Sequence, residues 1–127
     1  IGMILELKVE GIGNEACAIV KRTGFPGPLI YASFLMPELQ RVRQTDPDAK
    51  IMVLQHRRLP PDPVADVVAL DASHVGLHFS TVTPMLLQTY HNLGRQVFVY
   101  TVNEPQDIQR MRNLGVDGII SDYPDRI

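Results

Sequence analysis

The first clear pattern in the chain is an alternation of apolar and polar residues near its start. Leu5, Leu7 and Val9 fall on one face of this segment, whereas Glu6 and Lys8 fall on the other. A period of two residues predicts a β-strand. We expect the three apolar side chains to face covering helices and the two charged ones to point the other way.

A rhythm of strand followed by helix continues along the rest of the sequence. Short apolar runs alternate with segments of helical spacing. Strands are predicted at 4–9, 29–34, 51–54, 75–79, 97–102 and 118–121. Helices are predicted after Asn14, from Pro37 to before Asp46, over 64–70, from Thr83 to Gly94, and from about Pro105 to Gly115. Such alternation predicts a parallel sheet with helical crossovers.

Small and polar residues mark the predicted helix ends. Asn14 is expected to cap the first helix, and Gly24 to end it. Asn103 and Gln106 could form a capping box around Pro105. The proline-rich segment 57–63 is predicted to be a loop.

Two architectures fit this rhythm, and the pattern alone does not choose between them. One is a doubly wound, flavodoxin-like sheet; the other is an incomplete barrel. No glycine-rich nucleotide loop follows any predicted strand. Strand order discriminates, because a barrel arc keeps each strand beside the next, whereas a doubly wound sheet reverses direction once.

Composition narrows the class of protein. The chain has 127 residues, 45% of them hydrophobic, which is usual for one soluble domain. A net charge of −2 gives no electrostatic case for nucleic acid, and no apolar run approaches the roughly 20 residues of a membrane span. The single Cys17, expected to pack in the core, excludes an internal disulfide and fits a reducing, cytoplasmic location. The chain opens with Ile-Gly-Met-Ile-Leu, which is typical of the start of a strand and predicts a fragment.

Three motifs resemble the glycerophosphodiester phosphodiesterase family. The run Tyr100-Thr-Val-Asn is similar to the family's Trp-Thr-Val-Asn strand, with Tyr in place of Trp. The run from Gly115 to Pro124, Gly-Val-Asp-Gly-Ile-Ile-Ser-Asp-Tyr-Pro, resembles the family's last strand, with Ser121 in place of Thr. Glu6-Leu-Lys and Ser33-Phe match two earlier strands, and the order agrees along essentially the whole chain.

The resemblance implies a TIM (β/α)8 barrel in which residues 1–127 supply the third to the eighth strand. A whole barrel takes about 250 residues. In the family, the first two strands carry a His-Arg-Gly motif, a Glu-x-Asp pair and a second histidine. These would provide the catalytic acid and base and two metal ligands, so no catalytic residue is expected in this chain.

Three residues of the chain are candidate site residues. The resemblance implies that Glu6 is one ligand of a divalent metal, Ca²⁺ or Mg²⁺, for which carboxylate oxygens are suited. Lys8 would contact a phosphate oxygen as a point charge, and Tyr100 would form a wall for the glycerol moiety. Asp122, after the last strand, is expected to fix a loop or cap a helix.

The four histidines are not expected to replace the missing pair. His74 and His78 are four apart, which on a strand separates them by about 13 Å, too far for one metal ion. His56 is interpreted as a solvated loop residue, and His91 as complementing a helix C-terminus.

The resemblance therefore predicts metal-assisted hydrolysis of glycerophosphodiesters to an alcohol and glycerol 3-phosphate, with a small-molecule phosphodiester as substrate. The isolated chain is expected to be nearly inactive, and its open sheet edges invite self-association. The alternatives are a non-enzymatic α/β binding or scaffold domain and another phosphodiesterase barrel, such as a phospholipase relative.

Overall fold

The computed structural model describes all of residues 1–127, which fold as six parallel strands with helices between them. The strands are β1 (Met3–Glu6), β2 (Leu29–Ser33), β3 (Lys50–Leu54), β4 (His74–His78), β5 (Gln96–Tyr100) and β6 (Gly118–Ile119). The α-helices are α1 (Gly13–Thr23), α2 (Met36–Thr45), α3 (Ala65–Ala69), α4 (Pro84–Asn92) and α5 (Pro105–Leu114). Two 3₁₀ turns, η1 (Phe79–Thr81) and η2 (Pro124–Arg126), complete the chain.

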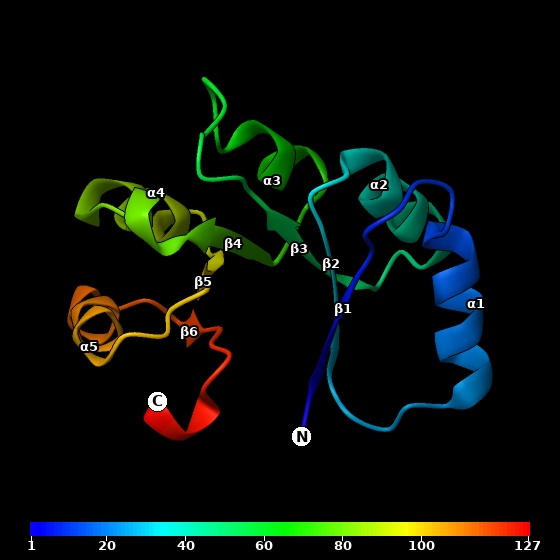
Figure 1. Cartoon of the computed structure of the whole chain (residues 1–127). Helices are drawn as coiled ribbons and strands as arrows, with labels where there is room; N and C mark the ends of the chain where they lie inside the picture. Colours follow the sequence, from blue (N-terminus) through cyan, green and yellow to red (C-terminus); the bar gives the residue numbers. More distant parts are fainter.

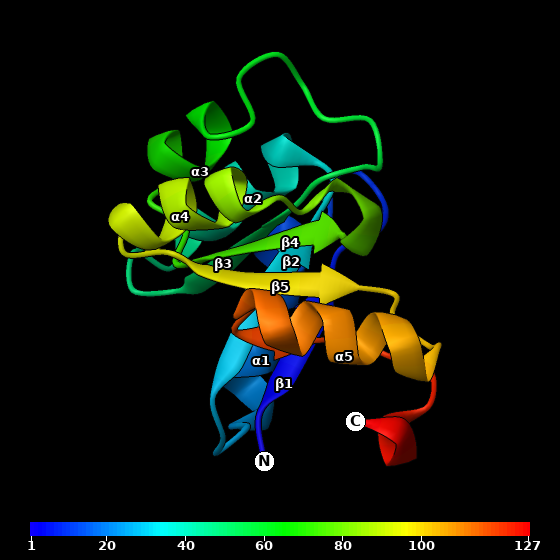
Figure 2. The same ribbon diagram turned by 90° about the vertical axis from the view of Figure 1, so that its left-hand side faces the viewer.

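Strand order settles the choice between the two architectures. The sheet runs β1-β2-β3-β4-β5-β6, and all five neighbouring pairs are parallel. The direction never reverses, so the prediction of a barrel arc is confirmed and the doubly wound sheet is wrong. The helices lie around the outside of the curved sheet, and the arc is open on the side where both termini lie (Figures 1 and 2).

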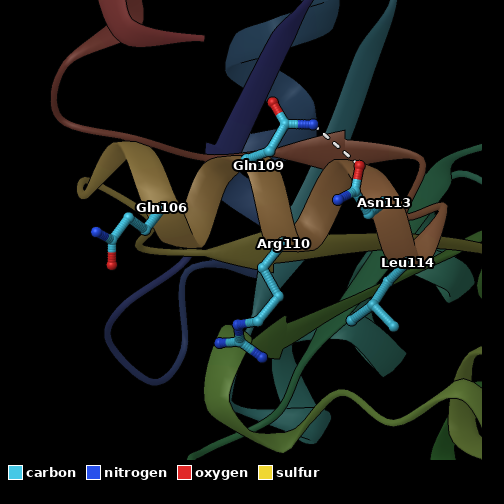
Figure 3. A pocket seen from close by; sticks show the side chains of 5 residues that line it. All are labelled: Gln106, Gln109, Arg110, Asn113 and Leu114. Atoms are coloured by element: carbon cyan, nitrogen blue, oxygen red, sulfur yellow. Dashed lines mark hydrogen bonds between the residues drawn. The ribbon is translucent and has the colours of Figure 1, made fainter.

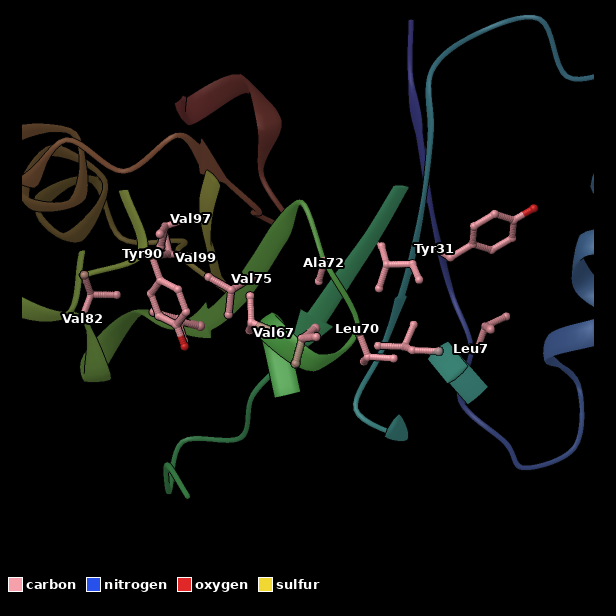
Figure 4. Close-up of a cluster of buried hydrophobic side chains, with 14 of the residues drawn as sticks. Leu7, Tyr31, Val67, Leu70, Ala72, Val75, Val82, Tyr90, Val97 and Val99 are labelled. Carbon is pink, nitrogen blue, oxygen red and sulfur yellow. The ribbon is translucent and has the colours of Figure 1, made fainter. Parts of the chain in front are cut away.

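The main core lies between the sheet and the helices. Outward-facing residues of the strands pack against inward-facing residues of the helices in one cluster of 21 buried side chains. Val75, Val97 and Val99 meet Tyr90 of α4 at one end of this layer, and Leu7 lies near Tyr31 at the other (Figure 4). Cys17 of α1 belongs to the same cluster, as expected.

A second, smaller cluster lies on the inner face of the arc. Ala32, Met52 and Leu54 are buried there, and Phe34 and Phe98 pack against them. Gly76 makes room for this cluster, because a Cβ atom at that position would lie 2.5 Å from a methyl carbon of Leu54. Large and small residues therefore alternate across neighbouring inner positions, as in a packed barrel interior.

The first strand is shorter than its alternation predicts. β1 ends at Glu6, and the Leu7 amide makes one further hydrogen bond to the Ala32 carbonyl. Val9 is 57% exposed, so the prediction that it faces the helices is wrong. The chain leaves the sheet here and turns at Gly11, whose φ of +83° is readily adopted by glycine.

Three predicted helix ends are confirmed, among them the end of α5 at Gly115, which is in the left-handed conformation. Gly24 ends α1 in the left-handed conformation, with its amide bonded to the Val20 carbonyl. The Thr83 hydroxyl caps α4 by accepting a hydrogen bond from the Leu86 amide at 3.1 Å.

Two predicted caps are wrong. Asn14 lies inside α1, whose first amides are bound instead by a side chain of α2. No capping box forms at α5, because Asn103 turns toward the last loop and accepts hydrogen bonds from Ser121 and Asp122. The Asn103 amide also donates to the Asp122 carboxylate at 3.0 Å, which confirms a loop-fixing role for Asp122.

None of the helices is long and apolar enough to span a membrane.

Candidate functional site

The carboxyl ends of all six strands meet at one edge of the arc, where barrel enzymes place their chemistry. Four aromatic rings gather there from three strand ends and one loop. Phe34 stacks on His56 with ring centroids 4.3 Å apart, and its ring meets Tyr100 edge-on at 5.9 Å. Tyr100 in turn meets His78 at 5.8 Å. We call these four residues the strand-end aromatic cluster.

Tyr100 occupies the centre of this cluster. Its hydroxyl donates a hydrogen bond to the Gln55 carbonyl, which ties the end of β5 to the segment after β3. Partial burial raises the pKa of the Tyr100 hydroxyl above its ordinary value, and the negative charge of Glu6 raises it further. The ring therefore forms part of the wall of this edge, in the electrostatic field of Glu6.

Glu6 is the last residue of β1 and faces the inner side of the arc. Its register partner is Ala32, a member of the inner cluster. The side chain is exposed, and none of the four ion pairs of the chain involves it. The structure thus brings Glu6 and Tyr100 to the same edge and leaves the carboxylate oxygens of Glu6 available to a ligand.

The donor set around Glu6 fits a single metal ligand and not a complete metal site. No group of three or more His, Cys, Asp or Glu side chains is gathered anywhere in the chain. Carboxylate oxygens suit hard cations such as Ca²⁺ and Mg²⁺, which take about six or more oxygen ligands. Further ligands of any metal at Glu6 would have to come from groups outside these residues or from substrate and water.

Lys8 lies beyond the end of β1, in the loop that leads to α1. Its side chain is exposed, and no ion pair involves it. The position of Lys8 is set by the loop rather than by strand pairing. The prediction that Glu6 and Lys8 project from the same strand face is therefore wrong for Lys8, which lies outside the strand.

Glu38 determines the path of that loop, and sequence reasoning missed it. The side chain is 1% exposed, and its carboxylate accepts hydrogen bonds from the amides of Gly11, Ile12 and Gly13 at 2.9–3.0 Å. These bonds, that of Gly11 above all, lower the pKa of Glu38. A carboxylate from α2 thus caps α1 and holds the chain segment that follows Lys8. A contact across 25 residues leaves no local signal in the sequence.

Of the three more prominent surface hollows, only one touches the strand ends. A shallow hollow of about 500 Å³ lies on α5 and is lined by the side chains of Gln106, Gln109, Arg110, Asn113 and Leu114 (Figure 3). A second, of about 580 Å³, lies beside Cys17, whose thiol has a pKa raised by burial. The third, of about 400 Å³, includes Phe34 and His56 of the strand-end aromatic cluster.

The positions of the four histidines agree in part with those predicted from the sequence. His74 and His78 are the first and last residues of β4, so the prediction that they lie on a strand, too far apart for one metal ion, is confirmed. His91 lies in the last turn of α4, 2.7 Å from Asp117. His56 is exposed, yet it stacks on Phe34, so it belongs to the site edge rather than to a freely solvated loop.

Known proteins share both the sequence and the arc. The model of the glycerophosphoryl diester phosphodiesterase family matches residues 5–126. A glycerophosphodiester phosphodiesterase of Caldanaerobacter subterraneus subsp. tengcongensis is 28% identical over 117 residues, which are 92% of this chain and 48% of the relative. This chain spans about half the length of the curated relatives it matches.

Solved structures share the fold of this chain. An Oleispira antarctica phosphodiesterase, in complex with the product sn-glycerol-3-phosphate, has a TM-score of 0.87 at 25% identity, covering 100% of this chain and 53% of that one. A Silicibacter pomeroyi protein with the same family assignment has a TM-score of 0.85 at 32% identity, covering 97% and 47%. Family match, strand order and the shared arc lead to one conclusion: the chain belongs to the glycerophosphoryl diester phosphodiesterase family.

Proposed function

We propose that this chain forms the Glu6-bearing part of an enzyme that hydrolyses glycerophosphodiesters to an alcohol and sn-glycerol 3-phosphate. The observation that carries the proposal is that Glu6, at the end of β1, and Tyr100, at the end of β5, lie at the same carboxyl edge of a barrel arc of this family. A free carboxylate and an aromatic wall at the same edge suit a phosphodiester with an organic group on each side.

Each candidate residue has a role in this proposal. Glu6 would hold a divalent cation, Ca²⁺ or Mg²⁺, which when bound supplies charge neutralisation to the phosphoryl oxygens. Lys8, on its loop held by Glu38, would place an ammonium group near a phosphate oxygen. Tyr100 would pack its ring against the glycerol carbons while its hydroxyl stays bonded to Gln55.

The isolated 127-residue chain is proposed to be nearly inactive. Histidine acid–base catalysis contributes large rate factors in such reactions, on the order of 10²–10⁴ for each well-placed group. His56 and His78 lie at the strand ends, but each packs against an aromatic ring of the cluster, and the family's motif histidines match no position in this sequence.

The two edge strands of the sheet, β1 and β6, each leave one edge unpaired. β1 and β6 each have one neighbour, and Ile4 of β1 is 40% exposed. Unpaired parallel strands invite strand addition, so we propose that the isolated chain associates with itself or with a complementary segment. A single monomeric species in light scattering across concentrations would rule out self-association.

The test is a chimaera in which this chain is joined to the part of the Oleispira antarctica phosphodiesterase that it does not cover. We expect glycerophosphocholine hydrolysis that needs added Ca²⁺ or Mg²⁺ and falls at least about 10²-fold in Glu6→Gln. Glu15→Gln, in the first turn of the outer helix α1, is the matched control and should keep activity.

Two results would contradict the proposal. Hydrolysis by the pure 127-residue chain, lost in Glu6→Gln, would show that the chain is a complete catalyst. A folded chimaera without hydrolysis would favour the alternative of a binding or scaffold domain.

A further inference from the structure

The hollow of about 400 Å³ at the strand ends lies between the two hydrophobic clusters of the molecule. Met36 and Leu59 in its lining pack against the main core. Phe34 and Leu54, also in its lining, belong to the inner cluster. The hollow therefore has apolar side chains from both clusters in its lining, and its size falls within the roughly 300–1,000 Å³ of small-ligand sites. We call it the β3 pocket.

The outer lip of the β3 pocket is the loop 57–63, and this loop is fixed at both ends. At its start, His56 stacks on Phe34. At its end, the Pro63 carbonyl accepts hydrogen bonds from the Gln55 side-chain amide and from the Tyr90 hydroxyl, at 2.9 Å for the latter. Gln55 is 6% exposed and Tyr90 is fully buried, so these anchors are part of the core.

A pocket held in this way is preformed, because little chain has to become ordered when a ligand enters. Three prolines in the loop, Pro60, Pro61 and Pro63, restrict its backbone further. A preformed apolar pocket retains more of its interaction energy as affinity than a mobile one does.

The pocket and the site edge share a wall. Phe34 lines the pocket and contacts Tyr100 edge-on, and His56 lines the pocket while stacking on Phe34. A substrate whose glycerol packs on Tyr100 could therefore extend its other organic group over Phe34. The lining of the pocket carries one charge of each sign, on Arg58 and Asp66.

We propose that the β3 pocket holds the apolar part of the alcohol moiety of the phosphodiester, and that Leu59 and Met36 select alcohols that carry a hydrocarbon group. The choice of occupant rests on the proposed function. A small cationic alcohol gains little net charge attraction here, because the negative charge of Asp66 is offset by Arg58 in the same lining. Burial of hydrocarbon against Met36, Leu59 and Phe34 provides the affinity.

Binding is tested first, without catalysis, on the 127-residue chain carrying ¹³C-methyl methionine. Met36 is the reporter in the pocket, assigned with Met36→Leu, and Met85, 81% exposed on α4, is the reference. With 1-hexanol as probe, we expect a saturable shift of the Met36 methyl signal and none at Met85. Choline is expected to leave Met36 unmoved.

Leu59→Ser should weaken hexanol binding at least about tenfold, equivalent to about 1.4 kcal/mol. Leu93→Ser, an exposed leucine at the end of α4, should leave it unchanged. Leu59→Ala serves the same purpose if the serine variant does not fold. The proposal is overturned if hexanol shifts Met36 and Met85 in parallel, if neither Leu59 variant weakens binding, or if choline binds more tightly than hexanol.

The selectivity is then tested in the chimaera described above. Two substrates are compared: the phosphodiester of glycerol with 1-hexanol, called the hexyl diester, and glycerophosphocholine. The ratio of kcat/KM for the hexyl diester to kcat/KM for glycerophosphocholine should fall about tenfold in Leu59→Ser. An unaltered ratio contradicts the proposed role of the pocket. Absence of turnover with both diesters, beside intact hexanol binding, contradicts the proposed function instead, so the two failures are distinguishable.

Discussion

The outer and inner faces of the same six strands differ in how they are covered. Outward residues of the central strands, such as Val75 and Leu77, are fully buried beneath helices, and those of the edge strands, such as Leu5 and Ile119, are partly buried. Inward residues are buried only on the middle strands, for example at Ala32 and Met52, whereas Ile4 and Glu6 of β1 remain exposed. Burial on the outer face therefore provides most of the stabilisation of the fold. On the open part of the inner face, side chains remain available for ligands.

Truncation of one apolar residue on each face should expose this difference most strongly. Leu77→Ala removes a fully buried side chain from the main core and should lower the free energy of unfolding by about 2–5 kcal/mol. Ile4→Ala, at a 40% exposed inner position, should cost less than about 1 kcal/mol. Urea unfolding followed by circular dichroism measures both.

Equal losses in the two variants would contradict the comparison, since they would mean that the inner side of β1 is covered in solution. Self-association through β1 is one way in which this could occur, and dilution of the Ile4→Ala variant would reveal it as a concentration-dependent midpoint.

A smaller effect is expected where the inner face is closed. Gly76→Ala places a Cβ atom 2.5 Å from a Leu54 methyl carbon, so the inner cluster must shift. We expect a loss of about 1–3 kcal/mol, as for other overpacked cores. The double variant with Leu54→Ala should recover part of that loss, because the clashing methyl group is then absent.

The double-mutant cycle distinguishes crowding from a backbone effect. A loss in the double variant that is smaller than the sum of the two single losses supports a packed interior. Simple additivity of the two losses would show that the two residues do not compete for space.

The parts of the fold that depend on local pattern could be predicted from the sequence. The alternation at Leu5 and Leu7, the end of α1 at Gly24 and the cap at Thr83 each involve neighbours within a few residues. Strand order also followed, because strand–helix alternation leaves few topologies and the family motifs favoured the barrel arc.

Features made by distant residues could not be predicted. The strand of Glu6 was predicted to run to Val9, but Glu38 holds the amides beyond it and draws the chain away from the sheet. His56 was interpreted as a solvated loop residue, but it stacks on Phe34, 22 positions earlier in the sequence. Both features set the site edge, so the site was less predictable than the fold.

The smallest expected effect is a dependence of stability on pH that arises at the closed part of the inner face. His74 is buried there, with its Nδ1 2.6 Å from the Ser73 hydroxyl and its ring edge-on to Phe98. Burial lowers the pKa of His74 below its ordinary 6.5, and the positive charge of Lys50 acts in the same direction, while the Gln96 side chain and Asp117 oppose it.

The sign follows from proton binding. Near pH 6 the unfolded chain binds more protons at His74 than the folded chain does, so stability increases with pH. The contribution is fully present above the unfolded pKa of 6.5 and is lost as the pH falls through that value toward the lower folded pKa. Urea midpoints measured between about pH 7.5 and about pH 5 should fall on acidification.

His74→Gln should flatten that fall, since the residue no longer titrates. His78→Gln should flatten it less, because the pKa of His78 is lowered in the same direction but its ring, at the open strand ends, is only half-buried. If both variants retain the wild-type slope, the dependence arises from other groups, of which Glu38 is expected to act only below about pH 4.5. If His78→Gln flattens the slope more than His74→Gln does, the closed part of the inner face extends to the strand ends, which contradicts the assignment of those ends to the open part.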